Sequence, residues 1–157
     1  MEPRIDYRKF APEALKSMFG LEKYIAESGI DEKLVHLIKM RASQINGCAF
    51  CIDMHSKDAR ALGETEQRLY ELDAWRETPF YNDRERAALE WTESLTLVSQ
   101  THVPDSVYDE VKKHFSDKEI IDLTFVITTI NAWNRLAIAT RAVPGHYQPR
   151  HSAASAS

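Results

Sequence analysis

Apolar residues recur along this chain with the spacing of α-helices. In the segment 31–45 they stand at Leu34, Leu37, Ile38 and Ile45, which follows the helical period. Helices are also predicted over 12–28, 48–62, 66–73, 83–99, 103–115 and 116–141. No segment of useful length alternates in the two-residue manner of a strand. The pattern predicts an all-α fold, a bundle of six or seven helices.

Residues that start and stop helices stand at the borders of these segments. Pro12 suits a first helical turn, Gly29 suits the end of that helix, and Asp31 suits the N-cap of the next. Gly63 fits a C-cap position. The run from Ser116 to Glu119 matches a capping box, which predicts that a new helix begins there.

The last predicted helix is apolar on nearly all sides, so we expect it to be buried on most of them. In a chain of this size a subunit interface is expected to cover part of it. Its charge-free part is about a dozen residues long, whereas a membrane span needs about 20. The polar positions Asn131, Asn134 and Arg135 are expected to make structural or inter-subunit contacts first, and site contacts second.

Composition and charge narrow the class of protein. The chain has 157 residues, 43% hydrophobic and 28% charged, with a formal net charge of -4. We expect one domain over 1–148 and a flexible C-terminal tail over 149–157. The acidic balance argues against a nucleic-acid partner, and no basic cluster suits a membrane surface. The first residues lack a signal-like apolar core, so a cytoplasmic location is expected.

The candidate chemistry lies in Cys48-Ala49-Phe50-Cys51, which holds the only two cysteines. The pair follows the turn signal Asn46-Gly47 and is expected at the start of a helix, where Cys48 and Cys51 share one face. A helix N-terminus favours the thiolate form of a cysteine. A disulfide across so short a loop stabilises a fold little. A redox role is therefore favoured.

His55 lies one turn after Cys51 on the same stripe, where an imidazole can take a proton from the nearer thiol. Two other interpretations remain open. The cysteines and His55 can be three zinc ligands, with His36 or Asp53 as a fourth, although no second ligand pair exists. The cysteines can also be inert core residues. A thioredoxin domain is disfavoured, because that fold requires strands before its CxxC.

The segment from His36 to His55, with its run Ser-Gln-Ile-Asn-Gly-Cys, resembles the core motif of the AhpD-like alkylhydroperoxidases in the carboxymuconolactone decarboxylase superfamily. The stretches 73–78 and 131–135 also resemble this family, so the likeness covers roughly 5–148. It implies an all-α fold, homo-oligomers that are commonly trimers or hexamers, and thiol peroxidase activity. That activity requires no metal or organic cofactor.

The resemblance also assigns roles. Cys51 would be the peroxidatic residue that attacks the peroxide, Cys48 would resolve the product to a disulfide, and His55 would belong to a proton relay. Helix-dipole reasoning alone favours Cys48 as the more acidic thiol, whereas proximity to His55 favours Cys51. His36 stands where the family has a Glu of the relay, so it is a possible relay member that lacks a fixed negative charge.

The expected function is therefore reduction of a peroxide substrate through a dithiol/disulfide cycle, with an external dithiol, small or protein-bound, as the reductant. Two alternatives are kept. One is a dithiol redox sensor or oxidoreductase without peroxidase turnover. The other is a lactone decarboxylase like the namesake of the superfamily, although such an enzyme does not need the dithiol.

Overall fold

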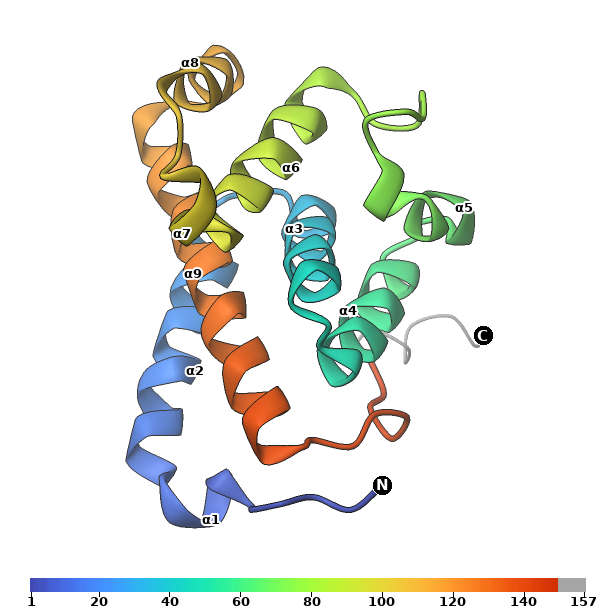
Figure 1. Cartoon of the computed structure of the whole chain (residues 1–157), viewed down its shortest axis with the longest axis vertical. Coiled ribbons are helices and arrows are strands. Elements are labelled where there is room, and N and C mark those ends of the chain that lie inside the picture. The colour runs from blue at the N-terminus through green and yellow to red at the C-terminus, as the bar shows by residue number, and fades with distance from the viewer. Residues whose placement is uncertain (150–157) are drawn as a thin grey trace.

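The structure is a computed structural model that describes residues 1–149, and all regular elements of these residues are helices (Figure 1). In chain order they are α1 (Tyr7–Phe10), α2 (Pro12–Glu27), α3 (Glu32–Asn46), α4 (Ala49–Ala61), α5 (Glu66–Tyr70), the 3-10 helix η1 (Leu72–Ala74), α6 (Asp83–Thr96), α7 (Val98–Thr101), α8 (Asp105–His114) and α9 (Asp117–Thr140). The all-α prediction is confirmed.

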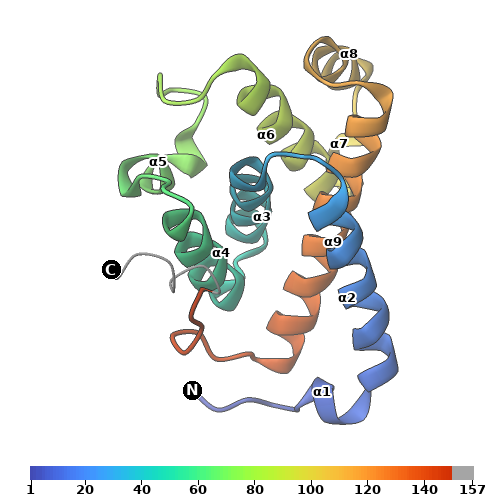
Figure 2. The same cartoon turned by 180° about the vertical axis from the view of Figure 1, so that it is seen from behind.

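Helix α3 occupies the middle of the bundle. It packs against α4, α6 and α9, while α2 runs along the far side of α9 (Figures 1 and 2). Four core leucine and isoleucine side chains have no exposed surface: Leu37 and Ile38 of α3, Leu89 of α6 and Leu123 of α9. Because core residues of α3 pack against three neighbouring helices, the orientation of α3 is fixed, and so are the directions of its other side chains.

The seven predicted helices are all present, and the extra elements are single turns. Helix α1 was not predicted. The predicted helix 83–99 is interrupted at Leu97, whose φ of -99° and ψ of 31° leave the helical region, so that α7 follows as a separate turn. The predicted helix 66–73 is α5 followed by η1.

The predicted helix borders have clear local causes. The side chain of Asp31 accepts a hydrogen bond from the backbone N–H of Leu34, which caps α3. Ser116 and Glu119 form the predicted capping box of α9. Gly47 ends α3 with a φ of 69°, a conformation that favours glycine. Asn46, which was predicted to lie in the turn, is instead the last residue of α3.

Helix α9 was expected to be buried on most of its sides, and part of its apolar surface is exposed in the single chain. Its apolar residues Ile121, Phe125 and Ile138 are 53%, 40% and 45% exposed, whereas the polar Asp122 and Asn134 are buried. Polar side chains of α9 find partners inside the bundle, and part of its apolar surface faces outward. That surface remains available to the predicted homo-oligomer.

Two further expectations concern the ends and the membrane. Within residues 1–149, no helix is both long and apolar enough to cross a bilayer. The predicted flexible tail 149–157 lies outside the described residues except for Pro149.

Candidate dithiol site

The two cysteines lie at the start of α4, directly after the Gly47 turn. Cys48 is the N-cap residue and Cys51 stands in the first turn. They form a disulfide with a Cα–Cα distance of 5.4 Å, and only 1% and 2% of their surfaces are exposed. The predicted position at a helix N-terminus is therefore confirmed, and the pair is sheltered from solvent.

The walls around the disulfide come mainly from α3 and α9. Ala42, Ile130 and Ala137 form one buried cluster with the two cysteines, and Phe50 packs against it. These small and aliphatic side chains form the apolar part of the walls around the sulfur atoms. Such surroundings shield a sulfur atom from water and strengthen electrostatic interactions that reach it.

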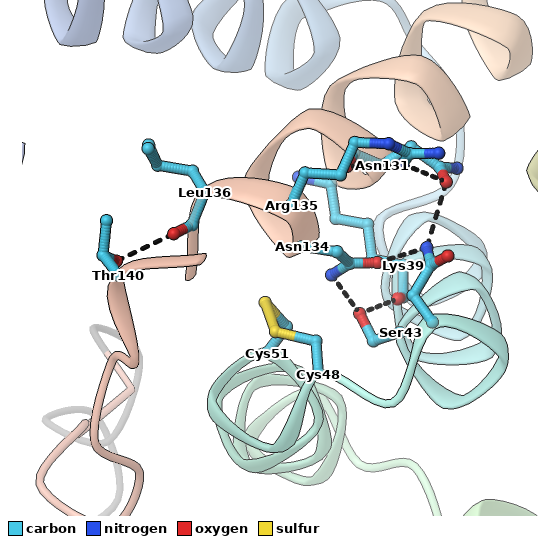
Figure 3. Close-up of a disulfide and its surroundings, with 10 residues drawn as sticks. Lys39, Ser43, Cys48, Cys51, Asn131, Asn134, Arg135, Leu136 and Thr140 are labelled. Atoms are coloured by element: carbon cyan, nitrogen blue, oxygen red, sulfur yellow. Dashed lines mark hydrogen bonds between the residues drawn. A yellow bond between two sulfur atoms is a disulfide. The ribbon is translucent and has the colours of Figure 1, made fainter. Parts of the chain in front are cut away.

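A network of amide and hydroxyl groups lies next to the disulfide (Figure 3). Asn134 Nδ2 donates to Ser43 Oγ over 2.9 Å, and Asn46 Nδ2 donates to both Asn134 Oδ1 and Asn131 Oδ1 over 2.9 and 3.0 Å. Ser43 Oγ in turn donates to the carbonyl of Lys39. These bonds tie α9 to the last two turns of α3, beside the residues that lead into the dithiol.

The polar residues of α9 thus have intrachain partners. Arg135 donates to the backbone and side-chain oxygens of Asn131 over 2.9 Å. Asn131 Nδ2 also donates to Thr96 Oγ1 and to the carbonyl of Ile127. The structural interpretation of these residues agrees with the geometry.

His55 and His36 meet across the α3–α4 contact. Their Nδ1 atoms are 3.3 Å apart, and their ring centroids are 5.5 Å apart. The difference between these two distances is close to the sum of the two ring radii, so the nitrogens face each other head-on. One ring therefore donates its Nδ1–H to the Nδ1 lone pair of the other.

Asp58, which the sequence analysis did not name, completes this group. Its Oδ2 atom lies 4.0 Å from the Nδ1 atoms of both His36 and His55. Tyr147 donates its hydroxyl to Asp58 Oδ1 over 2.7 Å. The signal that points to Asp58 is its i+3 spacing from His55, which places both on one helix face.

His55 is held in its neutral form. Burial lowers its pKa well below the ordinary value, and the charges of Lys39 and His36 lower it further. Its second ring nitrogen, Nε2, is buried and has no hydrogen-bond partner among the described residues. A neutral imidazole with one nitrogen engaged and the other unpartnered is suited to accept a proton.

The zinc alternative can be compared with this geometry. His36, His55 and Asp58 offer ligand atoms that lie within 4.8 Å of one another. The two Nδ1 atoms, however, face each other and not a shared third point, so the rings would have to turn to bind an ion. The geometry as it stands is that of an N–H···N hydrogen bond.

Asp53, the other fourth ligand considered, faces elsewhere. Its carboxylate pairs with Lys57 over 2.9 Å and accepts the backbone N–H of Gly145 over 3.0 Å. Lys57 Nζ also donates to the carbonyl of Tyr147 over 3.2 Å. Asp53 therefore anchors the segment after α9 along α4 and does not join the two histidines.

The sequence of this region matches a known family. The family model described as the carboxymuconolactone decarboxylase family matches residues 12–94, which include α3, the dithiol and His55. The chain belongs to this family. The family assignment that the CxxC motif suggested is thus confirmed.

Individual relatives of known sequence or structure resemble most of the chain. The protein YdfG of Bacillus subtilis (strain 168) is 50% identical over 139 residues, which cover 88% of this chain and 95% of YdfG. The crystal structure of ATU0492 from Agrobacterium tumefaciens, a protein of unknown function and candidate antioxidant defence protein AhpD, superimposes with a TM-score of 0.90. The two sequences are 44% identical, and the superposition covers 93% of this chain and all of ATU0492. This family member is therefore AhpD-like.

A further neighbour shows that the fold does not fix the reaction. The debrominase Bmp8 superimposes with a TM-score of 0.77 at 24% identity, over 86% of this chain and 73% of Bmp8. At this identity the likeness shows the shared fold. The reaction must be argued from the site itself.

Proposed function

We propose that this protein is a thiol-dependent peroxidase that reduces organic peroxides through a Cys48–Cys51 dithiol/disulfide cycle, as an antioxidant. The observation that carries the proposal is the buried His55, which is hydrogen-bonded to His36 through Nδ1 and whose Nε2 has no partner in the described part of the chain. In the disulfide form the sulfur atoms carry no proton. In the reduced form, a thiol one turn away on the same face is the natural donor to that nitrogen.

The proton route follows from the two ring nitrogens. When His55 accepts the thiol proton at Nε2, it can release its Nδ1 proton to Nδ1 of His36. The positive charge then rests on His36, whose side chain is 14% exposed, compared with 5% for His55. Because burial disfavours a charged His55, this transfer moves the charge to the better-solvated ring.

The Cys51 thiolate attacks the terminal oxygen of the peroxide, the O–O bond breaks, and Cys51 becomes a sulfenic acid. The departing alkoxide takes the proton that the histidine pair holds and leaves as an alcohol. The Cys48 thiol then attacks the sulfenic sulfur, which forms the disulfide and releases water. An external dithiol reduces the disulfide by exchange and is itself oxidised.

The roles of the two cysteines are part of the proposal. Both stand at the N-terminus of α4, where unpaired backbone N–H groups favour a thiolate. Cys51 is one turn from His55, whereas Cys48 is two turns away. We therefore assign Cys51 as the attacking residue and Cys48 as the resolving one.

A cavity of about 470 Å³, which Phe50 of the dithiol motif lines although neither cysteine does, suggests the substrate class. Phe50, which stands between the two cysteines, lines it, and its apolar wall also includes Pro3, Ile5, Tyr7, Val143 and Tyr147. An apolar cavity favours an alkyl or aryl hydroperoxide over hydrogen peroxide. The homo-oligomer and the external reductant belong to this proposal as well.

The test is peroxide consumption with an added dithiol, together with mass spectrometry of the thiols. The wild type should consume cumene hydroperoxide over many turnovers, and Cys51→Ser should consume none. The Cys48→Ser protein, treated with one equivalent of peroxide, should carry a trapped sulfenic acid on Cys51. A sulfenic acid found on Cys48 in the Cys51→Ser protein, with none on Cys51, would reverse the roles.

The alternatives predict different results in the same assay. A redox sensor would show one oxidation per subunit and no multiple turnovers with any dithiol. A decarboxylase would act on a carboxylated lactone and retain that activity in Cys48→Ser. Either result, in place of peroxide turnover, would contradict the proposal.

A further inference from the structure

We propose that Asp58 is a positioning residue that supplies the fixed negative charge for the His36–His55 pair, in place of the carboxylate that the resemblance implies at position 36. The inference rests on the proposed function for its role in turnover. The effect itself does not require turnover, because it concerns how readily the Cys51 thiol loses its proton.

The geometry places the charge between the two rings. Oδ2 of Asp58 lies 4.0 Å from the Nδ1 atom of each histidine, so it attracts a proton held on either ring to a similar degree. Oδ1 is fixed by the hydroxyl of Tyr147. The Asp58 side chain is only 13% exposed, so water screens this attraction weakly.

Other charges near the pair come from the neighbouring helices. Lys39 of α3 is buried and disfavours a proton on His55. Its ammonium is paired with Glu22 of α2, whose Oε2 lies 2.5 Å from Nζ, so part of its effect is neutralised. On α4 the facing charge is Asp58, and the segment after α9 contributes Tyr147. Asp58 is thus the carboxylate that touches both the pair and its anchor.

The sign of the effect is clear. Loss of the thiol proton creates a thiolate and a protonated histidine pair. The Asp58 carboxylate, close to both rings, stabilises the protonated pair, and so it favours the transfer. Removing the charge should raise the apparent pKa of the Cys51 thiol and slow every reaction of its thiolate.

Asp58 can also be regarded as a simple anchor for Tyr147, and Asp53 provides the control for that interpretation. Asp53 is on the same helix and binds the same segment through the N–H of Gly145, yet it pairs with Lys57 and not with a histidine. Asp53→Asn therefore loosens the segment without changing the charge beside the histidine pair. A purely structural role would make the two variants alike.

The experiment uses the reduced Cys48→Ser protein, in which Cys51 is the only thiol. Alkylation of Cys51 by iodoacetamide is measured from pH 5 to 10 in that protein and with Asp58→Asn, Asp58→Glu or Asp53→Asn added. We expect Asp58→Asn to move the midpoint of the profile up by about one pH unit and to lower the rate at pH 7 about tenfold. Asp58→Glu should return the rate to within about threefold, and Asp53→Asn should stay within about twofold.

The inference is overturned if Asp58→Asn shifts the profile no more than Asp53→Asn does. Unfolding followed by circular dichroism shows whether each variant is folded. If Asp58→Asn is not folded, Asp58→Glu still tests the site, because it retains the negative charge. Alkylation needs no peroxide, so the two proposals fail separately. If Asp58→Asn shifts the alkylation profile as expected while the wild type consumes no hydroperoxide, the peroxidase proposal is contradicted and the role of Asp58 stands.

Discussion

Helix α3 carries two polar clusters, one shared with α9 and one shared with α4, and they differ in what they can exchange. The amide cluster of Ser43, Asn46, Asn131 and Asn134 consists of groups that do not titrate. The histidine cluster of His36, His55 and Asp58 consists of groups that do, and one of its buried nitrogens has no hydrogen-bond partner within residues 1–149.

The difference indicates a division of labour along one helix. His36 and Ser43 are seven residues apart on α3, about two turns, so the two clusters begin about 10 Å apart along this helix. A satisfied buried network fixes geometry, because any rearrangement would leave polar groups unpaired. An unsatisfied titratable group is costly for stability and useful for chemistry. The amide cluster should therefore control stability and the histidine cluster should control pH dependence.

The largest effect that separates the clusters is expected for Asn134→Ala. Asn134 is fully buried, and its loss leaves Ser43 Oγ and Asn46 Nδ2 with fewer partners beside a new void. We expect the free energy of unfolding to fall by about 3 kcal/mol, measured by urea denaturation of the oxidised protein. The exposed Thr128 on the same helix gives the control, because Thr128→Ala should change stability by less than about 0.5 kcal/mol.

The same variant should leave the pH dependence of stability unchanged, since no titrating group is removed. If Asn134→Ala costs no more than Thr128→Ala, the amide cluster does not carry the structural role. If Asn134→Ala changes the slope of stability against pH, the two clusters are coupled, and their separate control of stability and pH dependence is contradicted.

A second, smaller effect concerns that slope. The pKa of His55 in the folded protein is well below the ordinary value of 6.5 because of burial, Lys39 and His36. Below pH 6.5 the unfolded chain therefore binds a proton that the folded chain refuses. One such proton makes stability fall by about 1.4 kcal/mol for each pH unit as the pH drops from about 6.5 toward the folded pKa.

His55→Asn removes this proton difference and should flatten the slope by that amount between pH 5 and 6.5. Urea denaturation of the oxidised wild type and variant at three pH values in this window measures it. Equal slopes in the two proteins would mean that His55 is not held neutral by the fold. Asn134→Ala serves as the control here, because it should lower the whole curve without changing its slope.

The sequence specified the helices well because their borders depend on neighbouring residues. Asp31 caps α3 through a bond to the N–H three residues on, and Ser116 pairs with Glu119 in the same way. The ends that the sequence misjudged lack such a signal. The helix is interrupted at Leu97, where no Gly or Pro indicates a break. The single turn α1 is too short to show a periodic pattern.

The site was less predictable, because its parts are far apart along the chain. The dithiol and His55 form one stripe on one helix, so spacing alone brings them together. The bond between His36 and His55 depends on how α3 folds back against α4, which no local pattern fixes. Asp58 could have been found from its i+3 spacing, whereas the anchoring of Asp53 to Gly145 spans 92 positions and could not.

The smallest expected effect tests whether the histidine cluster needs an imidazole at position 36. His36→Glu places there the carboxylate that the resemblance implies, and we expect the rate of Cys51 alkylation at pH 7 to stay within about threefold of that of the reduced Cys48→Ser protein. The new carboxylate and Asp58 would lie close enough to share one proton, so their combined charge changes by less than a full unit. The apolar control His36→Leu removes the hydrogen bond to His55 altogether, and the rate should fall about fivefold. If His36→Glu is as slow as His36→Leu, a carboxylate cannot replace the second imidazole, and this family member depends on a histidine pair to move its proton.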